Sequence, residues 1–67
     1  MCLAALYYHD NEGDKLIDDK IAFLKQGAGN SFSCVNLFGE RTDIMGELDF
    51  IDLQNSRICI RSLEMSK

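Results

Sequence analysis

Cys2 is the residue of this chain whose type and position could support metal chemistry. Cysteine is small enough that the initiator Met1 is normally removed before it, which leaves an α-amine and a thiol on one residue. Together they form a five-membered N,S chelate, and both deprotonate readily because the amine titrates at about 7.7–8.0 and the thiol at about 8.5. If Met1 stays, its amine could bind a metal together with the Cys2 amide and thiolate. Cys2 could also simply be the first apolar residue of a strand.

The other two cysteines, Cys34 and Cys59, sit between apolar neighbours in segments with strand character. Free cysteine in such surroundings behaves as a small hydrophobic side chain, so we predict two buried structural thiols. With three cysteines and no C-x-x-C pair, one chain cannot build a four-cysteine zinc site. The odd number also favours a reducing, cytoplasmic environment with free thiols.

No other residues combine into a catalytic or ligand-binding motif. His9 is the single histidine and is predicted to be a solvated side chain in a polar loop. Residues 2–8 form an extended segment, so His9 lies roughly 23 Å from Cys2 and cannot share a metal ion with it in one chain. The Gly27-Ala28-Gly29 run is followed by polar residues and a strand, which predicts a hairpin turn and not a phosphate-binding loop. No serine lies in a nucleophile motif, so we expect no enzyme activity.

Charge and composition exclude several classes of partner. The net charge is -4 and the isoelectric point is near 4.6, so the chain repels phosphate backbones and nucleic acid is not an expected partner. We expect neither a membrane span nor a signal peptide, because no apolar run is long enough and the N-terminus lacks a basic flank. Residues 1–67 are predicted to form a single domain whose small core favours oligomerisation.

Turn residues divide the chain into five short segments. Residues 2–8 are apolar on both faces and are predicted to be a central strand, followed by a hairpin loop at 9–14. Residues 31–37 alternate strictly, with Phe32, Cys34 and Asn36 on one face. Residues 41–53 contain Gly46, which could mark a bulge or a bend. Residues 57–63 are the last predicted strand.

Residues 15–26 fit two patterns. Asp14 could cap a helix, and Ile17, Ile21 and Leu24 have helical spacing. Alternation of apolar residues around Phe23 is equally typical of a strand, and propensity alone leaves both open. The even spacing of turns elsewhere predicts a small β-barrel.

Several segments resemble the CooT family, which are small nickel-binding accessory proteins of carbon monoxide dehydrogenase. The matching residues are Met1-Cys2-Leu3-Ala4, Leu37-Phe38-Gly39-Glu40, Gly46, Ile51-Asp52-Leu53 and Ile58-Cys59-Ile60. The resemblance implies an all-β fold, a five- to seven-stranded barrel of the Sm/SH3-like type, with residues 15–26 as a strand. It also implies a homodimer that binds Ni(II) at Cys2, the one carried-over ligand, and a nickel enzyme such as carbon monoxide dehydrogenase as partner.

The alternative is a small β-barrel without metal that binds RNA or another protein. Family members are also labelled as possible RNA-binding proteins on the basis of their fold, and fold alone does not fix function. Metal binding separates the two hypotheses, because only the first requires Cys2.

Overall fold

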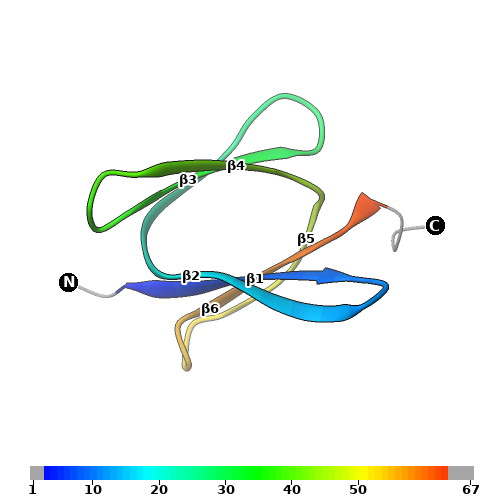
Figure 1. Cartoon of the computed structure of the whole chain (residues 1–67), viewed down its shortest axis with the longest axis horizontal. Coiled ribbons are helices and arrows are strands. Elements are labelled where there is room, and N and C mark those ends of the chain that lie inside the picture. Colours follow the sequence, from blue (N-terminus) through cyan, green and yellow to red (C-terminus); the bar gives the residue numbers. More distant parts are fainter. Residues whose placement is uncertain (1–2, 64–67) are drawn as a thin grey trace.

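Residues 3–63, the range that the computed structural model describes, form six β-strands and no α-helix (Figure 1). The all-β prediction is therefore confirmed, and six strands fall within the expected five to seven. The strands are β1 (Ala4–Asp10), β2 (Gly13–Gln26), β3 (Ser31–Asn36), β4 (Arg41–Met45), β5 (Glu47–Asp52) and β6 (Arg57–Arg61).

The six strands belong to one sheet in the order β4-β3-β2-β1-β6-β5. Strand β1 is central: it pairs antiparallel with β2 and parallel with β6. The predicted central position of this strand is therefore confirmed. The remaining pairs are antiparallel and join consecutive strands across short turns.

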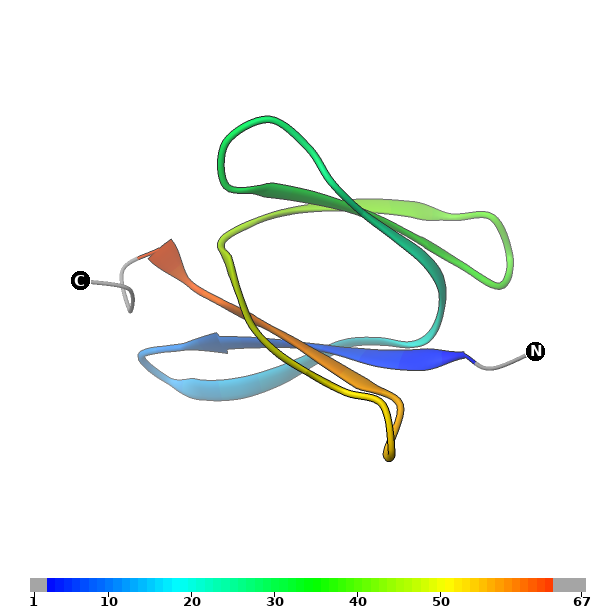
Figure 2. The ribbon, with the colours of Figure 1, turned by 180° about the vertical axis from the view of Figure 1, so that it is seen from behind.

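Strand β2 settles the ambiguity at residues 15–26. The whole segment is extended, so the helix alternative is wrong. The first half of β2 pairs with β1 and the second half with β3, and this pairing outweighs the local helical spacing. Register shifts next to Leu6 and between Ile21 and Phe23 bend the strand. Figures 1 and 2 show β2 curving away from β1 to carry the chain up to β3.

The bend folds the sheet over its own core. Side chains from β1 and β6 meet those from β3 and β4 in the interior, where they form the cluster Leu6, Ile21, Phe32, Cys34, Ile44 and Ile60. The predicted alternation of β3 is confirmed, since Phe32, Cys34 and Asn36 are buried while the residues between them are not. Removing this apolar surface from water is the main term that stabilises so small a domain.

Gly46 turns the chain from one side of the sheet to the other. It is the single residue between β4 and β5, and its amide donates to the carbonyl of Asn30 at 2.7 Å. A Cβ here would lie 2.5 Å from the carbonyl oxygen of Arg61 and 2.8 Å from a methyl carbon of Ile60. Only glycine allows so close an approach, which confirms the predicted bend.

The expected closure into a barrel is wrong. Strands β4 and β5 are the two edges of the sheet and, in the part of the chain that is described, do not pair with each other. A barrel requires its first and last strands to be hydrogen-bonded along their lengths. Here a one-residue connection at Gly46 sends β4 to β3 and β5 to β6, so the two edges diverge (Figure 2).

Candidate functional site

The start of β1 lies against the turn that joins β5 to β6. Parallel pairing places Ala5 opposite Arg57, and the amide of Ala5 donates to the carbonyl of Ser56 at 2.8 Å. Ser56 itself has a φ of +54°, a left-handed conformation that tightens this turn. A groove of 330 Å³ opens here, lined by Leu3, Ala4, Ile51, Asp52, Leu53, Ser56, Arg57 and Ile58.

This groove, which we call the N-terminal groove, is mostly apolar. Leu53 at its rim is 85% exposed, far more than is usual for leucine. The one carboxylate that lines this groove, that of Asp52, is already engaged. It accepts hydrogen bonds from the side chain of Asn55 at 2.9 Å and from the backbone amide of Asn55 at 3.2 Å, and it pairs with Arg57 at 3.3 Å. The hydrogen bond from the Asn55 side chain is the main cause that lowers the pKa of Asp52.

Cys2, the predicted metal ligand, lies outside the described residues, one peptide bond before Leu3. Residues 3–63 contain no group of three or more histidine, cysteine, aspartate or glutamate side chains arranged to hold a metal ion. The described residues therefore supply an apolar groove that begins at Leu3 but no ready-made set of ligands.

Cys34 and Cys59 are buried, as predicted. Cys34 lies in the core, 1% exposed, and its thiol donates to the carbonyl of Thr42. Cys59 lies on the other face of the sheet, beside Tyr7 and Phe50. Burial raises the pKa of both thiols, and nearby carboxylates add to this. A protonated buried thiol is a poor nucleophile and a poor ligand, so these cysteines are structural.

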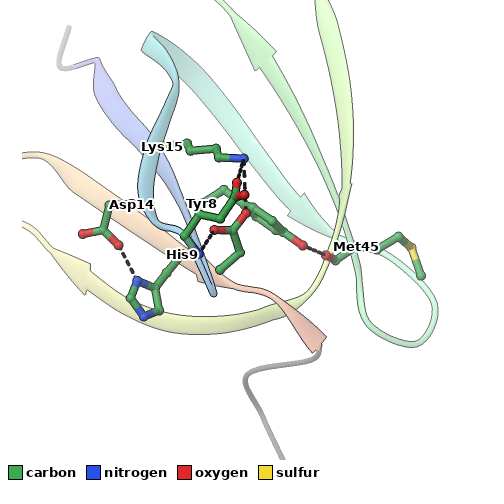
Figure 3. Close-up of polar contacts among 7 residues, drawn as sticks. Tyr8, His9, Asp14, Lys15 and Met45 are labelled. Atoms are coloured by element: carbon green, nitrogen blue, oxygen red, sulfur yellow. Dashed lines mark hydrogen bonds and ion pairs between the residues drawn. The ribbon is translucent and has the colours of Figure 1, made fainter.

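His9 differs from its prediction as a solvated loop side chain. It lies within β1, opposite Asp14 of β2, and its Nδ1 contacts that carboxylate (Figure 3). The loop predicted at 9–14 is only a two-residue turn, because both strands extend almost to its tip and Gly13 supplies the required positive φ. The side chain is about one-third exposed.

A second polar cluster lies on the inner side of β1, away from His9 (Figure 3). The hydroxyl of Tyr8 donates to the carbonyl of Met45 at 3.2 Å and so ties β1 to β4. At the hairpin tip the ammonium of Lys15 lies 3.4 Å from Asp10 and 3.3 Å from Glu12. The ring of Tyr8 also packs against the core cluster, so one side chain serves both the core and this polar contact. Its position two residues before Asp10, on the same face of a strand, could have indicated a polar role.

The Gly27-Ala28-Gly29 run is a hairpin turn, as predicted. Strand β2 ends at Gln26, the amide of Gly27 donates to the carbonyl of Ser31 at 2.9 Å, and Gly29 has a φ of +64°. No helix begins after it, so the helix N-terminus that a phosphate-binding loop requires is missing at this point of the described chain.

A family model described as "CO dehydrogenase accessory protein CooT" matches residues 1–61. The match includes Cys2 and all six strands. No curated protein and no solved structure matches the chain. Among the described residues, no helix has the length and apolar character needed to cross a membrane.

Proposed function

This chain belongs to the CooT family of CO dehydrogenase accessory proteins, and from that premise we propose that it is a dimeric Ni(II) carrier. In this proposal Cys2 holds the metal, and the recipient is a nickel enzyme such as CO dehydrogenase. The protein is not itself an enzyme: nickel is its cargo. It acts in the cytoplasm, where its thiols stay reduced. The family match over residues 1–61, which contains Cys2, is the observation that carries the proposal.

The chemistry of Cys2 supports nickel as the cargo. An α-amine and a thiolate on one residue give two donors, and two chains give four, which suits the square-planar preference of Ni(II). Cu(II) binds such donors more tightly still, so selectivity depends on which metal is available in the cell.

Several described side chains that could bind a metal already have other partners or are buried, which supports a site at Cys2. The carboxylate of Asp52 is occupied by Asn55 and Arg57, and His9 is paired with Asp14. The thiols of Cys34 and Cys59 are buried, with raised pKa values. Because these groups are engaged, a second Cys2 is the natural source of the remaining donors.

The N-terminal groove supports dimerisation. Leu3, Ile51 and Ile58 line it, and Leu53 stands almost fully exposed at its rim. A second copy would cover this apolar surface, and two-fold symmetry would bring the two N-termini to the same interface. The dimer and the metal site are therefore one proposal, since the same contact buries the groove and pairs the two Cys2 residues.

The proposal is tested by titrating the purified protein with Ni(II), after intact mass has established whether Met1 is present. We expect thiolate-to-nickel charge-transfer bands in the near ultraviolet, saturating at about one ion per two chains. Affinity should rise with pH over the range in which the amine and the thiol deprotonate, about pH 7 to 9.

Three variants locate the site. Cys2→Ser should remove most of the affinity, whereas Cys34→Ser and His9→Ala should leave it unchanged because those side chains are engaged elsewhere. Retained nickel binding in Cys2→Ser, or its loss in His9→Ala, would contradict the proposal. A metal-free RNA-binding or protein-interaction module would show no specific nickel binding, either in the parent protein or in any variant.

A further inference from the structure

A second groove follows the inner side of β4, the edge of the sheet. It has a volume of 350 Å³ and lies between β4 and the β1–β2 hairpin. Tyr8, Ile17 and Ile44 form its apolar wall, and Thr42, Asp43 and Met45 complete it. We call it the β4 groove.

Tyr8 links the β4 groove to an acidic hollow at the hairpin tip. This hollow has a volume of 340 Å³ and contains Asp10 and Glu12. Both carboxylates share the single cation Lys15, so the hollow keeps an excess negative charge. Tyr8 lines both spaces, as its reach from β1 to Met45 of β4 makes clear (Figure 3).

The backbone beside this groove favours an extended ligand. Among the described strands, β4 pairs only with β3, so one side of its backbone has no strand partner. Such an edge hydrogen-bonds readily to an added strand, and side-chain pockets beside it supply specificity. The other edge, β5, carries Glu47 and Asp49 in ion pairs with Arg61, which is a common protection against strand addition.

The charge of the protein favours a basic ligand. Every lysine and arginine in the described range except Lys25 already pairs with a carboxylate, as in Arg41–Asp43 at the end of β4. With a net charge of -4 the surface attracts cations and repels acidic peptides. The acidic hollow lies next to the apolar wall, so a ligand that fits both has aliphatic and basic side chains close together.

We propose that the β4 groove binds a basic, extended segment of a partner protein, which adds to the sheet beside β4. An aliphatic side chain of the segment packs on Ile17 and Ile44, and a lysine or arginine approaches Asp10 and Glu12. This site lies toward the opposite end of β1 from the N-terminal groove. It depends neither on Cys2 nor on nickel.

Amide chemical shifts of the nitrogen-15-labelled protein provide the test. The probes are two synthetic peptides of about ten residues, one alternating lysine with valine and the other glutamate with valine. The lysine peptide should shift the amides of β4 and the hairpin tip. The glutamate peptide should shift none of them at concentrations up to about 1 mM.

Two matched variants separate the groove from general electrostatics. Ile17→Lys should lower the affinity for the lysine peptide at least about tenfold, because it places a charge on the apolar wall. Leu16→Lys adds the same charge one residue earlier, opposite Tyr7 on the outer face, and should change affinity less than about twofold. Glu12→Gln changes an exposed side chain and should leave the fold intact. It should lower the affinity for the lysine peptide about threefold.

Several outcomes would overturn the proposal. These are no shifts with the lysine peptide, equal shifts with both peptides, shifts centred on β5, or equal weakening by Ile17→Lys and Leu16→Lys. Concentration-dependent shifts of β4 in the protein alone would identify a second copy as the occupant and would equally contradict it. The peptide and variant results do not bear on nickel binding, so the two proposals fail separately.

Discussion

At the scale of single residues, environment separates the three cysteines. Cys34 and Cys59 are buried on opposite faces of the sheet, and burial raises the pKa of each thiol. For Cys2 we propose a different role, metal binding, because an α-amine would accompany its thiol once Met1 is removed.

This division predicts how the thiols react. In Cys2→Ser, Cys34 and Cys59 should react slowly with a disulfide reagent at about pH 8, because their raised pKa keeps them protonated and both side chains are buried. Denaturant should release both. The absorbance of the released aromatic thiol measures the rate, and two fast equivalents in the native variant would be inconsistent with buried thiols.

Raised thiol pKa values also set the sign of a pH effect. The contribution of each buried thiol to the free energy of unfolding is complete below the unfolded pKa of about 8.5. That contribution is lost as pH rises toward the pKa of the thiol in the folded protein.

At the scale of elements, Asn36 organises the turn between β3 and β4. Its side chain donates to Asp18 at 3.0 Å and to Glu40 at 2.8 Å, and accepts from the amides of Phe38 and Glu40. The hydrogen bond from Asn36 is the main cause that lowers the pKa of Asp18. One buried amide thus joins this turn to β2.

Asn36→Ala should lower the free energy of unfolding by about 2 kcal/mol, because it removes four part-buried side-chain hydrogen bonds at once. Asn55→Ala, at the exposed β5–β6 turn, is the control and should cost about 0.5 kcal/mol or less. Urea denaturation measures both. The lowered pKa of Asp18 means that its ionised carboxylate stabilises the fold, and this stabilisation is complete only above the unfolded pKa of about 3.9. The cost of Asn36→Ala should therefore shrink as pH falls below that value. Equal costs for the two variants would remove Asn36 from this role.

Gly46 should be the least replaceable glycine among those that the structure describes with an ordinary negative φ. Gly46→Ala places a methyl group against the Arg61 backbone and should cost about 2–3 kcal/mol. In Gly27→Ala the nearest atom, at 2.8 Å, is the rotatable hydroxyl of Ser31, so the cost should be clearly smaller. Thermal unfolding compares the two, and equal melting temperatures would show that the bend tolerates a side chain.

The sequence predicted those strands whose pattern is local. Alternation identified the buried face of β3, and glycine identified the turn at 27–29 and the bend at Gly46. Residues 15–26 stayed ambiguous because helical spacing and strand alternation coincide there, and only pairing with β1 and β3 decides between them. Barrel closure was predicted wrongly, because whether two edges meet depends on how they diverge from Gly46.

The candidate site was only half visible in the sequence. The metal-binding role proposed for Cys2 rests on residue type and place in the sequence, whereas the N-terminal groove needs Leu3 to meet Ile51 and Ile58, about fifty residues later in the chain. The parallel pairing of β1 with β6 creates that contact, and no local pattern encodes it. The β4 groove was not predicted for a similar reason, because it needs Tyr8 to meet Met45, a contact between strands that lie far apart in the sequence.

At the scale of the whole molecule, the two grooves lie toward opposite ends of β1. The N-terminal groove is assigned to a second copy, and the β4 groove to a basic partner segment. A dimer built through the first would keep the second open on both subunits.

The dimer can be tested without metal. Leu53→Lys places a charge at the rim of the N-terminal groove, on a side chain that is 85% exposed and adds little to the core. The parent protein should have a mass near twice 7.6 kDa by light scattering, and the variant a mass near 7.6 kDa at the same concentration. Phe38→Lys, on a side chain that is 71% exposed at another turn, is the control and should leave the dimer intact. A parent that stays at the single-chain mass across a dilution series would exclude this interface.

Native mass spectrometry of the nickel-loaded protein reports Met1 processing, oligomeric state and metal content in one spectrum. We expect two chains that have each lost Met1 and together hold one nickel ion, and a Cys2→Ser protein that holds none. Nickel carried by single chains, or retained at equal occupancy in Cys2→Ser, would rule out a shared site at two Cys2 residues.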